Sequence, residues 1–204
     1  NNKLSFTSND LSLENPTQNY RIEMDYKLSD TWQSQTLLSK SSTSTKGYYT
    51  YLFDYGILGG NTFSRFLNKQ NANTLTTDIQ QNFIGNFKIS SLRNRVVIGL
   101  DYFNASQTDN GTGYAFYGNV TPQGGSNGDN PFTPAIETDS YPLSTSAVDA
   151  VLASQAVGNS KSEYNIYSLY VSDVLNIAQK FSAMLGLRLD RFDNKGSLST
   201  TSDD

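Results

Sequence analysis

The sequence contains no cysteine and no histidine among its 204 residues. Without histidine, a chain cannot build Ser-His-Asp or Cys-His catalytic sites or the common zinc-binding sets. Without cysteine, it has no disulfides and no thiolate ligands. Hydrolysis by a pair of carboxylates remains conceivable for such a composition, but no pair of acidic residues stands out. We therefore expect no enzymatic activity, no cofactor and no metal site.

Long hydrophobic runs are also missing. Only 36% of the residues are hydrophobic, and no run approaches the roughly 18 apolar residues that a membrane-spanning helix needs. A transmembrane β-barrel remains possible, because only every second residue of its strands faces lipid. The 13 tyrosines and 11 phenylalanines suit the aromatic girdles of such a barrel. The net charge of −4 gives no electrostatic reason to expect nucleic-acid binding.

The clearest pattern lies near the C-terminal end of the sequence. From Phe181 to Asp190, apolar residues alternate with mostly polar ones, and residues 164–177 alternate in the same way. A period of two predicts a strand with one apolar and one polar face. Only residues 176–179 separate the two runs, so we expect a tight antiparallel hairpin.

Similar alternation predicts strands at residues 20–27, 32–55, 77–89 and 96–105, with a weaker one at 4–7. The fold class is therefore all-β, an antiparallel meander of about six long strands. The connections at 28–31, 90–95 and 176–179 are short, whereas residues 56–76 and 106–160 are expected to form long loops. In the longer loop we expect one short helix that Ser146 caps and Gly158 ends.

Short and long connections alternate along the chain, so all short turns are expected at one end of the sheet. This asymmetry is typical of outer-membrane barrels, which have short periplasmic turns and long extracellular loops. A connector of 55 residues is unusual in a compact soluble domain. Two alternatives remain: a passive porin-like or adhesive barrel, and a soluble surface-binding β-sandwich, for which shorter strands are expected.

The residues also resemble a known family. The segment YSLYVSDVLNIAQKFSAMLGLRLDRFDN is similar to a strand-turn-strand segment of TonB-dependent outer-membrane siderophore receptors. There, Tyr-x-x-Asp leads through a short turn into an apolar run that ends Gly-x-Arg-x-Asp. The matching positions are Tyr170, Asp173, Gly186, Arg188 and Asp190. The segments RNRVVIGLDYFNAS and NYRIEMDYKLSDTWQ resemble further strands of the same family.

The resemblance implies that residues 1–204 are part of the β-barrel domain of such a receptor, with the plug domain and the remaining strands absent. It implies uptake of a ferric siderophore across the bacterial outer membrane, with energy supplied by TonB. The expected partners are outer-membrane lipid, the ferric siderophore as transported substrate, and the TonB complex through parts not in this chain.

Two groups of candidate site residues follow. In the longer loop, an extracellular ligand surface is expected to use Tyr114, Phe116 and Tyr117, although these rings would equally well pack on one another. On the polar, lumen-facing side of the sheet lie Asp101, Arg188 and Asp190, which we expect to pair with one another or with a plug. The aromatic run at residues 49–55 fits either a substrate entrance or an interfacial girdle.

Overall fold

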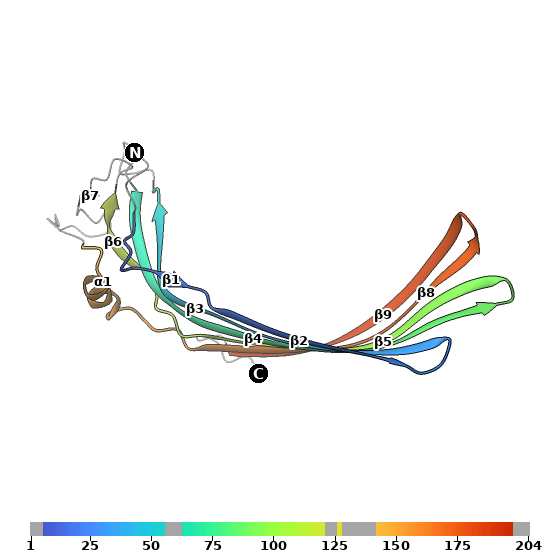
Figure 1. Ribbon diagram of the computed structural model, residues 1–204. Helices are drawn as coiled ribbons and strands as arrows, with labels where there is room; N and C mark the ends of the chain where they lie inside the picture. Colours follow the sequence, from blue (N-terminus) through green and yellow to red (C-terminus); the bar gives the residue numbers. More distant parts are fainter. Residues whose placement is uncertain (1–5, 56–62, 121–125, 128–141, 198–204) are drawn as a thin grey trace. The chain divides into compact units, whose positions relative to one another are not determined.

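The computed structural model describes residues 6–55, 63–120, 126–127 and 142–197. Its elements, in chain order, are β1 (Leu13–Glu14), β2 (Thr17–Lys27), β3 (Trp32–Phe53), β4 (Phe63–Ile89), β5 (Leu92–Asp109), β6 (Ala115–Val120), β7 (Ser126–Asn127), α1 (Thr145–Leu152), β8 (Ser160–Ala178) and β9 (Phe181–Ser197). The sheet follows the order β3-β4-β5-β8-β9, with β1 and β2 paired to β3 and with β6 paired to β4 (Figure 1). The predicted all-β antiparallel meander with one short helix is confirmed.

The predicted C-terminal hairpin is present. Strands β8 and β9 pair antiparallel, with Leu169 opposite Leu189 and Val171 opposite Leu187. Residues at these positions share one face, and their polar neighbours Ser168 and Asp190 lie opposite each other on the other face. The turn is shorter than expected, because β8 continues to Ala178 and β9 begins at Phe181.

Several strands are longer than the alternation predicted. Strand β4 begins at Phe63, so most of the loop expected at 56–76 is strand, and the expected loop at 106–160 contains β6, β7 and α1. The first part of β4 lacks clean alternation, but its pairing with β6 between Phe63 and Leu67 holds it extended. The weak strand expected at 4–7 lies partly outside the described residues, and residues 6–7 are not in a strand.

The chain divides into two compact units. Unit 1 consists of residues 1–16, 44–73 and 108–160, and unit 2 of residues 17–43, 74–107 and 161–204. In unit 2, the three short turns lie at the same end of the sheet, as expected (Figure 1). One of them connects β4 to β5 with two residues, and Ser90 takes a φ of 58° there. Such positive φ values are common in two-residue hairpin turns.

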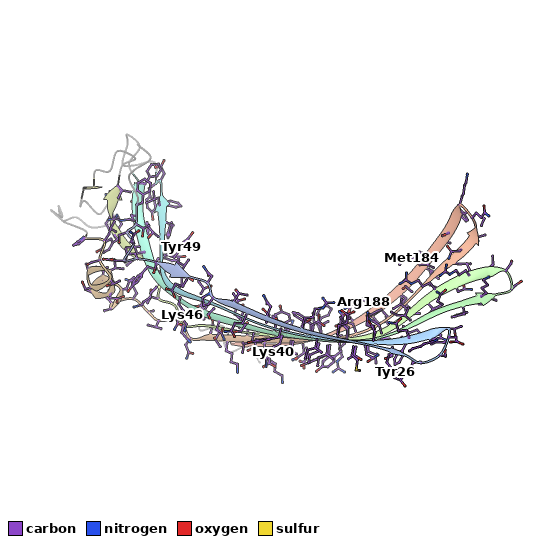
Figure 2. All side chains as sticks on the ribbon, in the orientation of Figure 1. Tyr26, Lys40, Lys46, Tyr49, Met184 and Arg188 are labelled. Carbon is purple, nitrogen blue, oxygen red and sulfur yellow. The ribbon has the colours of Figure 1, made fainter. Side chains whose placement is uncertain are left out.

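The two faces of unit 2 differ in chemistry. Large apolar side chains cover one face and are exposed: Ile22, Met24, Ile79, Ile98, Leu100, Leu185, Leu187 and Leu189. Leu185 is 81% exposed. Figure 2 shows Tyr26 and Arg188 on opposite sides of this sheet. An exposed apolar surface of this kind marks a site of contact with a membrane or with another protein.

Unit 1 has a small core of its own. Helix α1 covers one side of its sheet and places Val148 and Leu152 against Leu67 and Tyr117, all 3% exposed or less. The N-cap is Ser144, whose side chain accepts a hydrogen bond from the backbone N–H of Ala147. The helix was therefore predicted in the right segment but with its cap two residues too late. No helix in the described part of the chain is long and apolar enough to cross a membrane.

Candidate functional site

The three charged residues predicted on the polar face of unit 2 meet in one network. Arg188 donates to Asp190 at 2.8 Å, to Asp101 at 2.9 Å and to the Ser168 hydroxyl at 2.7 Å. Asp101 lies on β5 and Arg188 on β9, and β8 runs between them. The side chain of Asp101 is only 10% exposed. The guanidinium therefore links three neighbouring strands through charge-assisted hydrogen bonds.

Tyr170 joins this network to the centre of the sheet. The guanidinium carbon of Arg188 lies 5.5 Å from the centroid of the Tyr170 ring. The ring itself covers Gly99 of β5, where an added Cβ would lie 2.0 Å from its Cζ atom. Beyond Gly99, the Tyr170 hydroxyl donates to the side-chain oxygen of Asn82 on β4. Only glycine at position 99 leaves room for this ring.

The polar chain then continues toward the other edge of unit 2. The Asn82 amide donates to Gln35 on β3 at 3.2 Å, and the Gln35 amide donates to Glu23 on β2 at 3.0 Å. Arg21 pairs with Glu23 at 3.4 Å. Side chains of six strands are thus connected across one face. Asn82 and Gln35 were not singled out from the sequence. The alternation of residues 77–89 places Asn82 on the polar side, whereas the residues around Gln35 show no such pattern.

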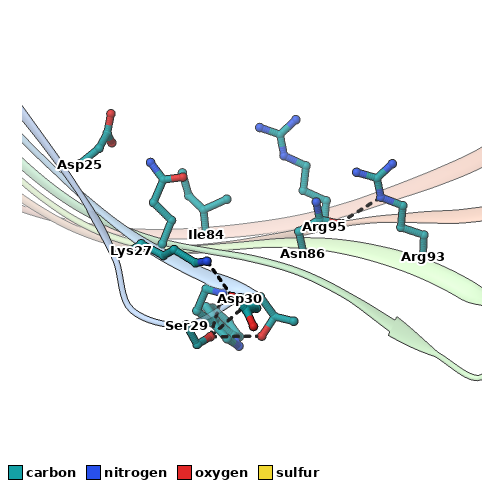
Figure 3. A pocket seen from close by; sticks show the side chains of 11 residues that line it. Asp25, Lys27, Ser29, Asp30, Ile84, Asn86, Arg93 and Arg95 are labelled. Carbon is teal, nitrogen blue, oxygen red and sulfur yellow. Dashed lines mark hydrogen bonds and ion pairs between the residues drawn. The ribbon is translucent and has the colours of Figure 1, made fainter.

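A cavity of about 580 Å³ lies on this polar face, at the end with the short turns (Figure 3). Two arginines of β5, Arg93 and Arg95, line this cavity, and the Arg93 guanidinium donates a hydrogen bond to the side-chain oxygen of Asn86 at 3.0 Å. Lys27 pairs with Asp30 at 2.6 Å. The cavity is lined mainly by polar side chains, as expected for the wall of a water-filled lumen.

Unit 1 carries a cluster of aromatic rings, which we call the aromatic cluster: Tyr51, Phe53, Tyr55, Phe66, Tyr114 and Phe116. Tyr51 stacks on Phe66 at 5.1 Å and meets Tyr114 edge to face at 4.9 Å. Phe66 and Phe116 are paired across β4 and β6 and lie 5.9 Å apart. Tyr114 is 48% exposed, so part of the cluster is open to solvent.

The third aromatic residue predicted for a ligand surface, Tyr117, is separated from the other two. It is 2% exposed and belongs to the core beneath α1. Its hydroxyl donates to the carbonyl of Pro142, and its own carbonyl accepts from Arg65 at 2.9 Å. The Arg65 guanidinium also stacks over its ring at 5.3 Å. Tyr117 thus connects β6, β4 and the segment before α1.

A second contact holds α1 to the sheet of unit 1. Asp149 of α1 accepts hydrogen bonds from Lys69 of β4 at 3.0 and 3.2 Å and from the Tyr48 hydroxyl of β3 at 2.9 Å. The hydrogen bond to Asp149 raises the pKa of Lys69 above its ordinary value. Burial, together with the same carboxylate, raises the pKa of Tyr48. Both groups therefore hold their protons more tightly when α1 is docked.

Comparison with known families gives a match over almost the whole chain. The family described as TonB dependent receptor-like, beta-barrel matches residues 1–203. No curated protein sequence matches the chain.

Solved structures give the same architecture. The closed form of Fiu, the ferric-catecholate import receptor of Escherichia coli K12, is 16% identical over 94% of this chain, with a TM-score of 0.66. BauA, the ferric preacinetobactin receptor of Acinetobacter baumannii, is 20% identical over 92%, also with a TM-score of 0.66. The siderophore receptor PiuA of the same species is 16% identical over 94%, with a TM-score of 0.66. This chain spans about a quarter of each receptor, 25%, 26% and 27% respectively.

Proposed function

Because this chain belongs to the TonB dependent receptor-like β-barrel family, we propose that it forms the part of a receptor wall that admits a ferric siderophore. The energy for uptake would come from TonB, through parts of the receptor outside this chain. The observation that carries the proposal is the half-open aromatic cluster of unit 1. Its rings offer a flat apolar surface next to hydroxyl groups, which suits an organic iron chelate.

Family membership fixes the setting of this activity. The chain is part of a barrel in the bacterial outer membrane, and the family consists of transporters rather than enzymes. The exposed apolar face of unit 2, from Ile22 to Leu189, is therefore the face that meets lipid. The network of Arg188, Asp101 and Asp190 lies on the opposite face, which in a barrel lines the lumen.

The candidate ligand surface has a rigid support. Helix α1 and the core residues Leu67 and Tyr117 pack on one side of the sheet of unit 1, and the cross-strand pair Phe66 and Phe116 lies on the other. Alternation along β4 and β6 produces this separation. Of the residues predicted to contact ligand, Tyr114 and Phe116 lie in the aromatic cluster, and we propose these two as contacts together with Tyr51. Tyr117, on the opposite side of β6, would make no ligand contact and would instead hold in place the strand that carries Phe116.

The proposal is tested in the bacterium that produces the full-length receptor. We expect that deleting the gene abolishes uptake of at least one radiolabelled ferric siderophore under iron limitation, and that the wild-type gene restores it. Deleting tonB in the complemented strain should abolish uptake again. Uptake that persists without TonB would indicate a passive porin-like barrel instead. If the deletion strain takes up every ferric siderophore as fast as the wild-type strain does, the proposal is contradicted.

The role of the aromatic cluster has its own test. Replacing Tyr114 and Phe116 together by alanine is expected to weaken siderophore binding about tenfold, since each ring contact is worth about 0.5–1.5 kcal/mol. The matched control is Tyr164→Ala, which removes an exposed ring of unit 2. Equal affinity in the double variant and the wild type would remove these two residues from the ligand surface.

A further inference from the structure

Strand β5 brings two arginines to the cavity at the short-turn end of unit 2. Arg93 and Arg95 occupy alternate positions of the strand, so they share its polar face with Asp101, whereas Ile98 and Leu100 lie on the exposed apolar face. Alternate positions of an extended strand are about 7 Å apart, a distance that two arginine side chains can span. Figure 3 shows both guanidinium groups extending from the same side of the sheet. The two groups can therefore meet one bound solute.

Most of the hydrogen-bond donors of these two arginines have no partner. Arg93 donates from Nε to the neutral side chain of Asn86, which leaves the N–H groups of its two terminal nitrogens. Arg95 makes no hydrogen bond or ion pair with any residue that the structure describes. Both arginines are exposed. Their donors are therefore available to a solute in the cavity.

The carboxylates of this region do not neutralise the two arginines. Asp30 pairs with Lys27 at 2.6 Å. Asp25 lies on β2, and β3 and β4 separate β2 from β5, which amounts to about 14 Å at the usual strand spacing. Figure 3 shows Asp25 at the opposite end of the cavity from the two guanidinium groups. Asp101 lies about 20 Å further along β5 and pairs with Arg188. The β5 end of the cavity therefore carries positive charge that no described carboxylate offsets.

The cavity also has the size and the lining of a ligand site. Its volume of about 580 Å³ lies within the range of about 300–1,000 Å³ that small-molecule sites occupy. Trp32 and Ile84 contribute apolar surface, and Gln33 and Asn86 contribute amide groups. A guanidinium group binds a carboxylate or a similar planar anion through two parallel hydrogen bonds. The combination of apolar surface and guanidinium groups suits an organic anion.

The place of the cavity in the barrel indicates which organic anion reaches it. The short turns of outer-membrane barrels face the periplasm, and the polar face of the sheet lines the lumen. Cationic side chains on the wall of a pore favour the passage of anions. We therefore propose that Arg93 and Arg95 bind an anionic ferric chelate at the periplasmic end of the lumen, as the chelate leaves the receptor. This inference rests on the proposed siderophore uptake, and it adds a second contact site and the charge class of the substrate.

The test is the uptake of radiolabelled chelates, at saturating concentration, by cells that produce the full-length receptor. The probes are a ferric tris-catecholate and ferric citrate, which are anionic, and a neutral ferric trihydroxamate. We expect uptake of at least one anionic chelate to depend on the receptor gene. The double variant Arg93→Gln/Arg95→Gln should lower the maximal rate of that uptake about tenfold, the effect of losing one hydrogen bond to a charged group.

Two control variants separate the charge of the site from other effects. Arg93→Lys/Arg95→Lys keeps the positive charge and should lower the rate less than about threefold. Lys180→Gln removes an exposed cation from the turn between β8 and β9, outside the cavity, and should leave uptake unchanged. The amount of folded receptor in each strain is verified by the heat-dependent mobility of the barrel on a denaturing gel.

A reversal of charge gives a second, independent measurement. Arg95→Glu places a carboxylate in the cavity and should lower uptake of the anionic chelate further than Arg95→Gln does, because the anion then meets repulsion. Equal rates for these two variants would overturn the inference.

The remaining outcomes separate the inference from the proposed function. Unchanged uptake of the anionic chelate by the double glutamine variant, an equal loss in the double lysine variant, or gene-dependent uptake of neutral chelates alone would overturn the inference and leave siderophore uptake standing. If the glutamine variant also becomes sensitive to vancomycin, which the wild type excludes, the arginines hold another part of the receptor and the inference is wrong. If the receptor takes up no ferric siderophore, the proposed function fails and the inference fails with it.

Discussion

Gly99 is the position where the structure makes its sharpest prediction. A Cβ at this site would lie 2.0 Å from the Tyr170 Cζ and 2.4 Å from its hydroxyl oxygen. Both atoms belong to the rigid phenol group of Tyr170, so Gly99→Ala must move the whole ring. Moving the ring breaks its hydrogen bond to Asn82, which is 8% exposed, and its stacking with Arg188.

The cost follows from those two contacts. A buried acceptor that loses its hydrogen-bond partner costs about 1–3 kcal/mol. Loss of a cation–π contact adds about 0.5–1 kcal/mol. We therefore expect Gly99→Ala to destabilise the barrel by about 2–4 kcal/mol. The control is Gly186→Ala on β9, where the nearest atom to the new Cβ would be 3.6 Å away, an ordinary contact.

The measurement is the free energy of unfolding of the full-length receptor in detergent micelles, in a double-mutant cycle with Tyr170→Ala. Once the ring is gone, Gly99→Ala should cost less than about 0.5 kcal/mol, so the two substitutions should be coupled by about 2 kcal/mol. Gly186→Ala should cost little in either background. If Gly99→Ala costs the same with and without the Tyr170 ring, the packing of that ring on Gly99 does not determine the stability of this region.

Two further predictions concern the lipid-facing surface and the docking of α1. Replacing Leu187, on the apolar face of β9, by arginine should lower the folding stability by about 2–4 kcal/mol and reduce the yield of folded receptor in liposomes. Arginine in place of Ser182, on the polar face of the same strand, should be tolerated. Equal yields for the two variants would contradict the assigned facing. Because the pKa values of Lys69 and Tyr48 are raised when α1 is docked, the stability they contribute is present below their ordinary values of 10.5 and 10.0 and is lost as pH rises above them. Subtilisin should therefore cleave α1 faster at about pH 11 than at about pH 8, when each rate is divided by the rate for an unstructured peptide at the same pH. The variant Lys69→Met should show a smaller difference between the two pH values. A normalised cleavage rate that does not change with pH would contradict the contact between α1 and the sheet.

The sequence alone determined the strands that alternate regularly and the facing of their side chains. In residues 181–190, each side chain's face depends only on its position in an extended backbone, so period two predicts it locally. The short hairpin turns follow for the same reason, since the two alternating runs leave few residues between them. The polar positions of Asp101, Arg188 and Asp190 were predictable on this basis, and so was the exposed apolar row of Leu185, Leu187 and Leu189.

Tertiary structure decided the rest, because those features depend on partners distant in sequence. Residues 63–76 carry no alternation, and pairing with β6 helps to keep the first part of this segment in β4. The surroundings of the aromatic rings expected in the longer loop depend on different partners. Phe116 packs against Phe66 in the aromatic cluster, whereas α1 and Arg65 enclose Tyr117. No local pattern encodes such a contact, since it arises only when segments distant in the sequence are placed side by side.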